Sequence, residues 1–249
     1  MTGGAIGYTS ATLLPGTTIA GSDDAAAWPA SRLRDGRPAS KCRTAGVGGA
    51  KTWTITTLQP LPVLAYNIEG HNFTSAATIT ITAGGAAPEA VTWAAGRIVG
   101  LLAYVREGTS IVLSVTDAAN GDGYLELGAF HAWATFDPVE KADVEMQHTF
   151  HDPSTAVESI HRARTVRSRT QYERRTWSWS HLPRARAMAL QDVCSILARN
   201  GRGLVIGDVV NGLAERATYG VIESAASHVL SGPADTRRDV VGVTVREEL

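Results

Sequence analysis

Cysteine, charge and long apolar runs are all scarce in this sequence of 249 residues. The two cysteines, Cys42 and Cys194, are too few and too far apart for a disulfide framework, so we expect both to be reduced thiols. Charged residues make up 19% of the chain and the formal net charge is −1, which indicates no general affinity for nucleic acid or anionic membranes. No apolar run approaches the length of about 18 residues that a membrane span requires.

The amino terminus also lacks the pattern of a secretory signal. The opening MTGGAIGYTSATLLPG has no basic region and no long apolar stretch. We therefore expect synthesis in a reducing cytoplasm, with no export route encoded in the chain itself. Release from the cell as part of a particle is compatible with these features.

Glycine, alanine, threonine and alternating apolar residues dominate the first part of the chain. The first fifty residues are loop-rich, and after them the pattern changes to short strands of period two separated by glycine-containing turns. Short strands at regular spacing predict an antiparallel β-sandwich over residues 1–138. The expected strands are 53–57, 63–73, 77–82, 91–93, 98–105, 110–116 and 124–135.

A second domain, β-rich with one helix, is predicted over residues 139–249, after a boundary near Phe136-Asp137-Pro138. Its helix is expected at about 183–200, because a proline suits the first turn, Asn200-Gly201 suits the end, and apolar residues recur at helical spacing. The expected strands around it are 175–181, 203–206, 218–222 and 240–245. The chain as a whole is therefore predicted to be mainly β.

No motif in the sequence points to catalysis, a metal or a cofactor. The stretch AGVGGAKT at 45–52 lacks the glycines of a phosphate loop and leads into a strand instead of a helix. The histidines fall at no known metal-ligand spacing, and no nucleophile elbow is present. We expect no catalytic residues, no metal ligands and no cofactor.

Arginine is concentrated between Arg162 and Arg186, where eight arginines face a single acid, Glu173. Three interpretations are open: a subunit interface, ordinary solvated strand faces, or a nucleic-acid surface with stacking aromatics. The scarcity of lysine and the balanced charge elsewhere favour the interface. The candidate interface residues are Arg162, Arg164, Arg167, Arg169, Arg174, Arg175, Trp177 and Trp179.

Two stretches resemble known families. AAAWPASRLRDGRPASKCRT (25–44), followed by WTITTLQPLPVLAYNIEGHNF (53–73) and YLELG (124–128), resembles a discoidin-like, galactose-binding-type jelly roll. ERRTWSWSHL (173–182), then a helix, GLVIGDVV (203–210) and ATYGVIES (217–224), resembles the tail-tip and distal-tail proteins of long-tailed phages.

These resemblances imply a non-enzymatic structural subunit of a phage tail tip or baseplate, located in the virion. The expected partners are copies of the chain in a trimeric or hexameric ring, neighbouring tail proteins and host surface glycans, with no nucleic acid and no membrane insertion. The candidate ligand-binding residues are Arg37, Arg43, His71 and Asn72.

Two alternatives stay open beside that expectation. One is a carbohydrate-binding module, free or attached to a polysaccharide-degrading enzyme. The other is a hydrolase of a cell-surface polymer, which would need two carboxylates about 5–10 Å apart.

Overall fold

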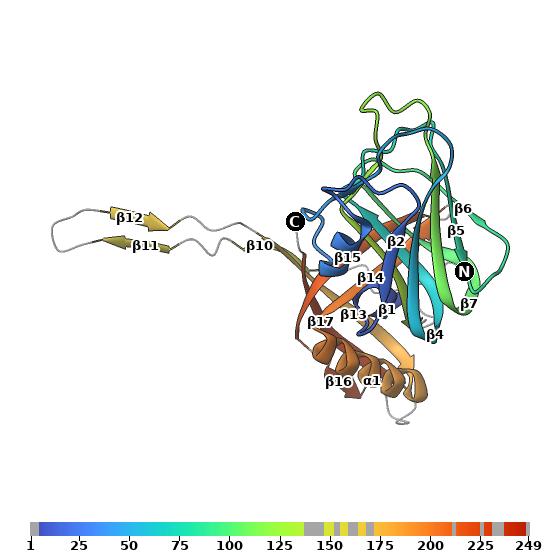
Figure 1. Cartoon of the computed structure of the whole chain (residues 1–249). Helices are drawn as coiled ribbons and strands as arrows, with labels where there is room; N and C mark the ends of the chain where they lie inside the picture. Colours follow the sequence, from blue (N-terminus) through green and yellow to red (C-terminus); the bar gives the residue numbers. More distant parts are fainter. Residues whose placement is uncertain are drawn as a thin grey trace. The chain divides into compact units, whose positions relative to one another are not determined.

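The chain divides into two mainly β units in a computed structural model (Figure 1). The structure describes residues 5–136, 147–151, 155–158, 164–167, 172–210, 213–224, 227–230 and 237–247. The first unit comprises Met1–Lys141 together with Gly203–Ala217, and the second comprises Ala142–Arg202 together with Thr218–Leu249. The predicted boundary near Phe136-Asp137-Pro138 stays a prediction, and the sequence analysis did not assign residues 203–217 to the first unit.

Two long, bent strands, β4 (Lys51–Glu69) and β7 (Arg97–Thr116), build the first unit. They pair antiparallel along most of their length, but the register shifts between Thr56 and Leu61. Residues 51–56 of β4 belong to one layer, with β2 and β5, and residues 61–69 belong to a second layer, with β9. Irregularities of this kind let a strand turn from one layer of a sandwich into the other.

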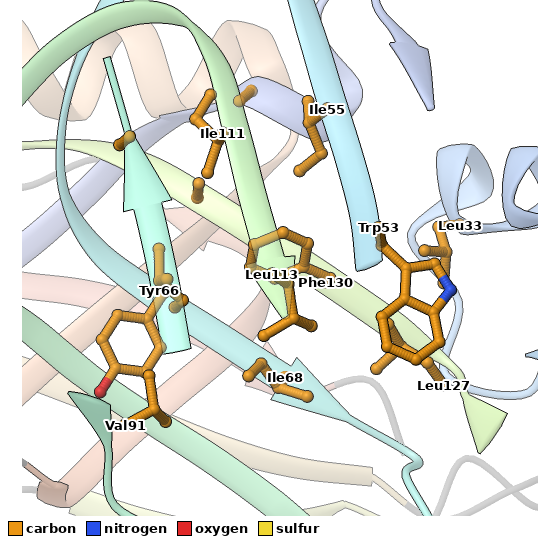
Figure 2. Packing of buried hydrophobic residues seen from close by; sticks show 14 of the residues in the cluster. Leu33, Trp53, Ile55, Tyr66, Ile68, Val91, Ile111, Leu113, Leu127 and Phe130 are labelled. Carbon is orange, nitrogen blue, oxygen red and sulfur yellow. The ribbon is translucent and has the colours of Figure 1, made fainter. Parts of the chain in front are cut away.

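The main core lies between these two layers. Figure 2 shows Trp53, Ile55, Ile111 and Leu113 of the first layer packed with Tyr66, Ile68 and Phe130 of the second. Alternation explains which strand residues face this core, because every second side chain of a strand points to the same face. The other elements of this unit are β1 (Ala5–Ser10), β2 (Thr18–Gly21), β3 (Cys42–Arg43), β5 (Thr78–Ala83), β6 (Glu89–Val91), β8 (Glu126–Leu127), β9 (Ala129–Phe136), β14 (Arg202–Val210) and the 3-10 helices η1 (Ala11–Leu13) and η2 (Ala30–Asp35).

The second layer is buried on its outer face as well. In β4, Ala65, Asn67 and Glu69 alternate with the core residues and are nevertheless buried. Further along this layer, β1 pairs antiparallel with β9 on one side and with β14 on the other. The amino-terminal strand is therefore an internal strand of the sheet, and a segment about 200 residues later in the chain completes the layer.

The second unit contains the helix α1 (Arg184–Asn200), as the sequence predicts. Gly201 adopts a left-handed conformation (φ 74°) and donates its N–H to the carbonyl of Leu197, which ends the helix. The apolar face of α1 is buried, at Ala187, Leu190, Val193, Cys194 and Leu197. The strands of this unit are β10 (Gln147–His151), β11 (Thr155–Glu158), β12 (Arg164–Arg167), β13 (Tyr172–Pro183), β16 (Ser227–Leu230) and β17 (Arg237–Glu247), and β15 (Leu213–Ser224) begins in the first unit and ends in the second.

Candidate functional site

The loops of the first unit converge at one end of its sandwich. Because β4 is bent, both of its ends lie beside the segment 22–46: Asp23 forms an ion pair with Lys51 at the start of the strand, and the carbonyl of Pro38 lies against Gly70 just after its end. The loop that follows β7 joins them, since Leu125 donates its N–H to the hydroxyl of Thr44 (2.8 Å). Residues far apart in sequence therefore meet at this end.

Two glycines allow the close approach of these loops. Gly70 has a φ of 64°, a conformation that side chains disfavour, and a Cβ atom there would lie 2.9 Å from the carbonyl oxygen of Pro38. A Cβ atom on Gly128 would lie only 2.2 Å from the same oxygen. The sequence from Asp35 to Lys41 can pack against the strand ends only because both positions lack a side chain.

The guanidinium of Arg43 is held between two aromatic rings at this end. Its Cζ atom lies 4.3 Å from the ring centroid of Trp28 and 4.7 Å from that of Tyr124, both of which are half-buried. The guanidinium of Arg32 also lies over Trp28, at 4.5 Å. These are cation–π distances. The backbone N–H of Arg43 also donates to the backbone carbonyl of Trp28 (3.0 Å), which holds the backbone of Trp28 beside β3.

A buried carboxylate completes the cluster. Glu126 accepts a hydrogen bond from Nε of Arg43 (2.7 Å) and forms a second ion pair with Lys41. Its side chain is 8% exposed, whereas both cations are partly exposed. We call Trp28, Arg32, Lys41, Arg43, Tyr124 and Glu126 the loop-end cluster.

Asn72 holds the loop of the cluster in place. Its side-chain amide donates to the carbonyl of Tyr124 (3.0 Å) and to the carboxylate of Asp122 (2.9 Å), and its Oδ1 accepts the N–H of Glu126 (2.7 Å). These bonds use the donors and the acceptor of the amide within the protein. Asn72 therefore positions Tyr124 and Glu126, and the expected ligand-binding role for it stays a prediction.

His71 is also engaged by the protein. Its Nδ1 accepts the N–H of Phe73 (3.2 Å) and its Nε2 lies 3.1 Å from the carbonyl oxygen of Ala94, while the ring stacks on Phe73 at 4.7 Å. A neutral imidazole with its proton on Nε2 satisfies both bonds. Burial lowers the pKa of His71, with a smaller opposing contribution from the bond to Ala94. The geometry gives this residue a structural task.

The other two predicted ligand residues differ in their surroundings. Arg43 lies in the loop-end cluster, as described above. Arg37 is exposed, and its hydrogen bonds among the described residues are made by its backbone: the N–H donates to the side chain of Asp35 (2.8 Å) and the carbonyl accepts the N–H of Ser40 (2.9 Å). The sequence prediction therefore named one residue of the cluster itself, Arg43, and one residue that positions it, Asn72. It did not single out Arg32, Lys41, Tyr124 or Glu126, although the sequence does show five basic residues (Arg32, Arg34, Arg37, Lys41, Arg43) against one acid between Ala30 and Arg43.

The predicted interface residues of the second unit have different placements. Trp177 and Trp179 are fully buried within the chain, and their assignment to a subunit interface stays a prediction. Arg174 and Arg175, in β13, are half-buried. Arg164 and Arg167 lie in β12, and Arg162 and Arg169 lie outside the described residues.

Neither a metal centre nor a membrane-spanning helix occurs in the described part of the chain. Cys42 and Cys194 are both buried thiols, as the sequence predicts. Burial raises the pKa of the Cys42 thiol to about 12, so this side chain belongs to the core.

No protein-family model matches the chain, and no curated protein matches it at a significant level. Solved structures similar to it include the chitosan-binding module 1 of a chitosanase/glucanase from Paenibacillus sp. IK-5, which is 17% identical, with 50% of this chain and 98% of that chain covered and a TM-score of 0.41. A family 32 carbohydrate-binding module of NanJ from C. perfringens, solved with galactose, is 14% identical, with 47% and 93% covered and a TM-score of 0.39. A fucose-binding module from Streptococcus pneumoniae is 12% identical, with 51% and 96% covered and a TM-score of 0.39. The likeness concerns the fold and extends over about half of this chain.

Proposed function

We propose that the first unit is a non-catalytic carbohydrate-binding module whose ligand site is the loop-end cluster. The observation that carries the proposal is the arrangement of Trp28, Arg43 and Tyr124 over a buried carboxylate. Such a site combines planar aromatic groups with fixed hydrogen-bonding groups, which is how small polar ligands are oriented in protein sites. Ligand binding by a rigid site costs little ordering entropy, and the bonds of Asn72 supply that rigidity.

A saccharide suits this chemistry because it presents hydroxyl groups around an apolar ring face. Arg43 and Lys41 are partly exposed hydrogen-bond donors. The exposed side chain of Asp122 is a nearby acceptor, linked to the cluster through Asn72. The half-buried rings of Trp28 and Tyr124 orient the guanidinium of Arg43 through cation–π contact.

The test is binding of the full-length chain to a glycan array, followed by calorimetric titration of the saccharides retained. Tyr124→Ala is expected to weaken the affinity about 30-fold, corresponding to roughly 2 kcal/mol for an anchor residue. Tyr104→Ala is the matched control, since Tyr104 is a tyrosine that is 68% exposed at the bend of β7, away from the loop end. Retention of no saccharide at all by the folded chain would refute the proposal.

We also propose an assembly role for the second unit. The strands β11 and β12 form a separate two-stranded sheet and pair only with each other among the described residues. A two-stranded sheet by itself is marginally stable in water, so packing against a neighbouring chain would stabilise this one. Arg164 and Arg167 of the arginine-rich segment lie in this sheet, which supports the interface interpretation of that segment.

The mass of the purified chain by light scattering, over a range of concentration and salt, tests this role. A defined trimer or hexamer that dissociates on the double charge reversal Arg164→Glu, Arg167→Glu is the expected result. A monomer at every concentration would contradict self-assembly. The finer proposal, a tail-tip subunit of a phage particle, predicts that antibodies against the chain label the tail in electron micrographs, and unlabelled tails would refute it.

A further inference from the structure

The loop-end cluster carries a surplus of positive charge. Lys41 and Arg43 share the single carboxylate of Glu126, so one negative charge faces two cations. Both cations reach the surface, with side chains 38% and 30% exposed, while the carboxylate is 8% exposed. Solvent and ligands therefore meet the cationic part of the group rather than the acid.

The aromatic rings of the cluster are in contact with guanidinium groups. The Cζ atom of Arg43 lies over the rings of Trp28 and Tyr124, and that of Arg32 also lies over Trp28. Stacking on an aromatic ring orients a guanidinium while leaving its N–H groups available in the plane of the group. The rings thus present cations to a ligand, which changes the character of the site from apolar to basic.

Several hydrogen-bond donors of these cations remain unused by the described protein. Arg43 donates a hydrogen bond to Glu126 from Nε and forms an ion pair with it through Nη2, and its Nη1 has no hydrogen-bond partner among the described residues. For the guanidinium of Arg32, the interaction found among the described residues is the cation–π contact with the ring of Trp28. A guanidinium with unused N–H groups matches an oxyanion, because the two can form parallel charge-assisted hydrogen bonds.

We propose that the saccharide bound at the loop-end cluster is anionic, with a carboxylate or sulfate group held by Arg32 and Arg43. This inference rests on the proposed carbohydrate-binding function and specifies its ligand class. Lys41 adds a third positive charge beside the bound group, and Glu126 serves to fix Lys41 and Arg43 rather than to bind the ligand.

Matched pairs of saccharides that differ only in charge test the inference. The full-length chain is titrated with oligogalacturonate and its methyl ester, and with dextran sulfate and dextran, at 50 mM and about 200 mM salt, a range over which ionic contacts weaken markedly. At least one acidic member is expected to bind ten or more times more tightly than its neutral partner, with an affinity that falls as salt rises. Arg32→Gln is expected to weaken acidic binding three- to tenfold, and Arg199→Gln, which removes the same charge from exposed Arg199 of α1, is expected to have no effect.

The two proposals fail in distinguishable ways. Binding of neutral and acidic members with equal affinity, or retention of neutral glycans alone on the array, overturns the anionic ligand and leaves the carbohydrate-binding module standing. Equal weakening by Arg32→Gln and Arg199→Gln overturns the assigned site, because the effect is then one of overall charge. Retention of neither class by a chain with a native circular dichroism spectrum overturns both proposals.

Discussion

The first unit is expected to fail to fold when the chain is cut at Lys141. The fragment 1–141 contains β1 but not β14, which pairs with it through Ala5↔Ile206, Ile6↔Val205 and Gly7↔Leu204. Without that partner, one edge of β1 carries unpaired N–H and carbonyl groups that were internal to the sheet. The cut therefore exposes a strand edge and removes apolar packing at the same time.

The magnitude follows from the burial of β14. Leu204, Val205 and Ile206 are each 0% exposed. Full burial of one such side chain contributes about 1.5–3 kcal/mol, so the three together contribute roughly 5–9 kcal/mol. Because a typical domain is stable by only about 5–15 kcal/mol, this loss is comparable with the whole stability of the unit.

Urea unfolding followed by circular dichroism compares three proteins: the full chain, the fragment 1–141, and the same fragment joined to residues 203–217 by a flexible Gly/Ser linker. The fragment is expected to show no cooperative transition or a much lower midpoint, and the rejoined fragment is expected to recover. A linker followed by a scrambled 203–217 segment is the control. If fragment 1–141 unfolded cooperatively at the midpoint of the rejoined protein, the assignment of 203–217 to the first unit would be refuted.

Four further predictions concern single side chains. Glu126→Gln leaves its two cationic partners, which are partly exposed, without a counter-charge. We expect the free energy of unfolding to fall by about 1–2 kcal/mol and the melting temperature to fall by roughly 2–8 °C. An unchanged melting temperature would contradict the ion pairs. Leu190→Ala in the buried face of α1 is expected to destabilise the second unit by about 2–5 kcal/mol in urea unfolding, whereas exposed Gln191→Ala should have no measurable effect. Burial lowers the pKa of His71 in the folded chain, so the unfolded chain takes up a proton first as pH falls below the ordinary histidine value of about 6.5. The free energy of unfolding should therefore decrease with falling pH in that range. For His71→Gln, the free energy of unfolding should decrease less steeply. The thiol of Cys42, with a pKa raised by burial to about 12, should react with a thiol reagent only after denaturation, and rapid labelling of the native chain would show that it is accessible.

Local features of the sequence were sufficient for several elements. The helix α1 of 17 residues is flanked directly by its start residue, Pro183, and its stop residue, Gly201, and its apolar stripe lies between them, so its bounds were predicted closely. Alternation likewise identified β5 and the separate halves of β4 and β7. What alternation did not indicate is that each pair of halves is one bent strand. Pro60 and Pro62 read as a break, yet they lie at the irregular part of the β4–β7 pairing, where a missing ladder hydrogen bond is tolerated.

The strand β1 was not predicted, for a related reason. Its residues are mostly small, and within the loop-rich first fifty residues they show no clear period. A close approach to Trp133 requires a glycine at Gly7, since a Cβ atom there would lie 2.8 Å from the indole. The strand exists because β9 and β14 supply its hydrogen-bond partners, and neither is near it in sequence.

The sequence by itself determined the mainly β class, the helix α1 and the basic character of the segment that carries Arg43. Only the tertiary structure decided that Glu126 and Tyr124 meet Arg43, that Trp177 and Trp179 are buried, and that residues 203–217 complete the first unit. The physical reason is the range of the interactions. Periodicity and capping act over a few residues and are written locally, whereas strand pairing and ion pairing depend on which distant segments the bend of β4 brings together.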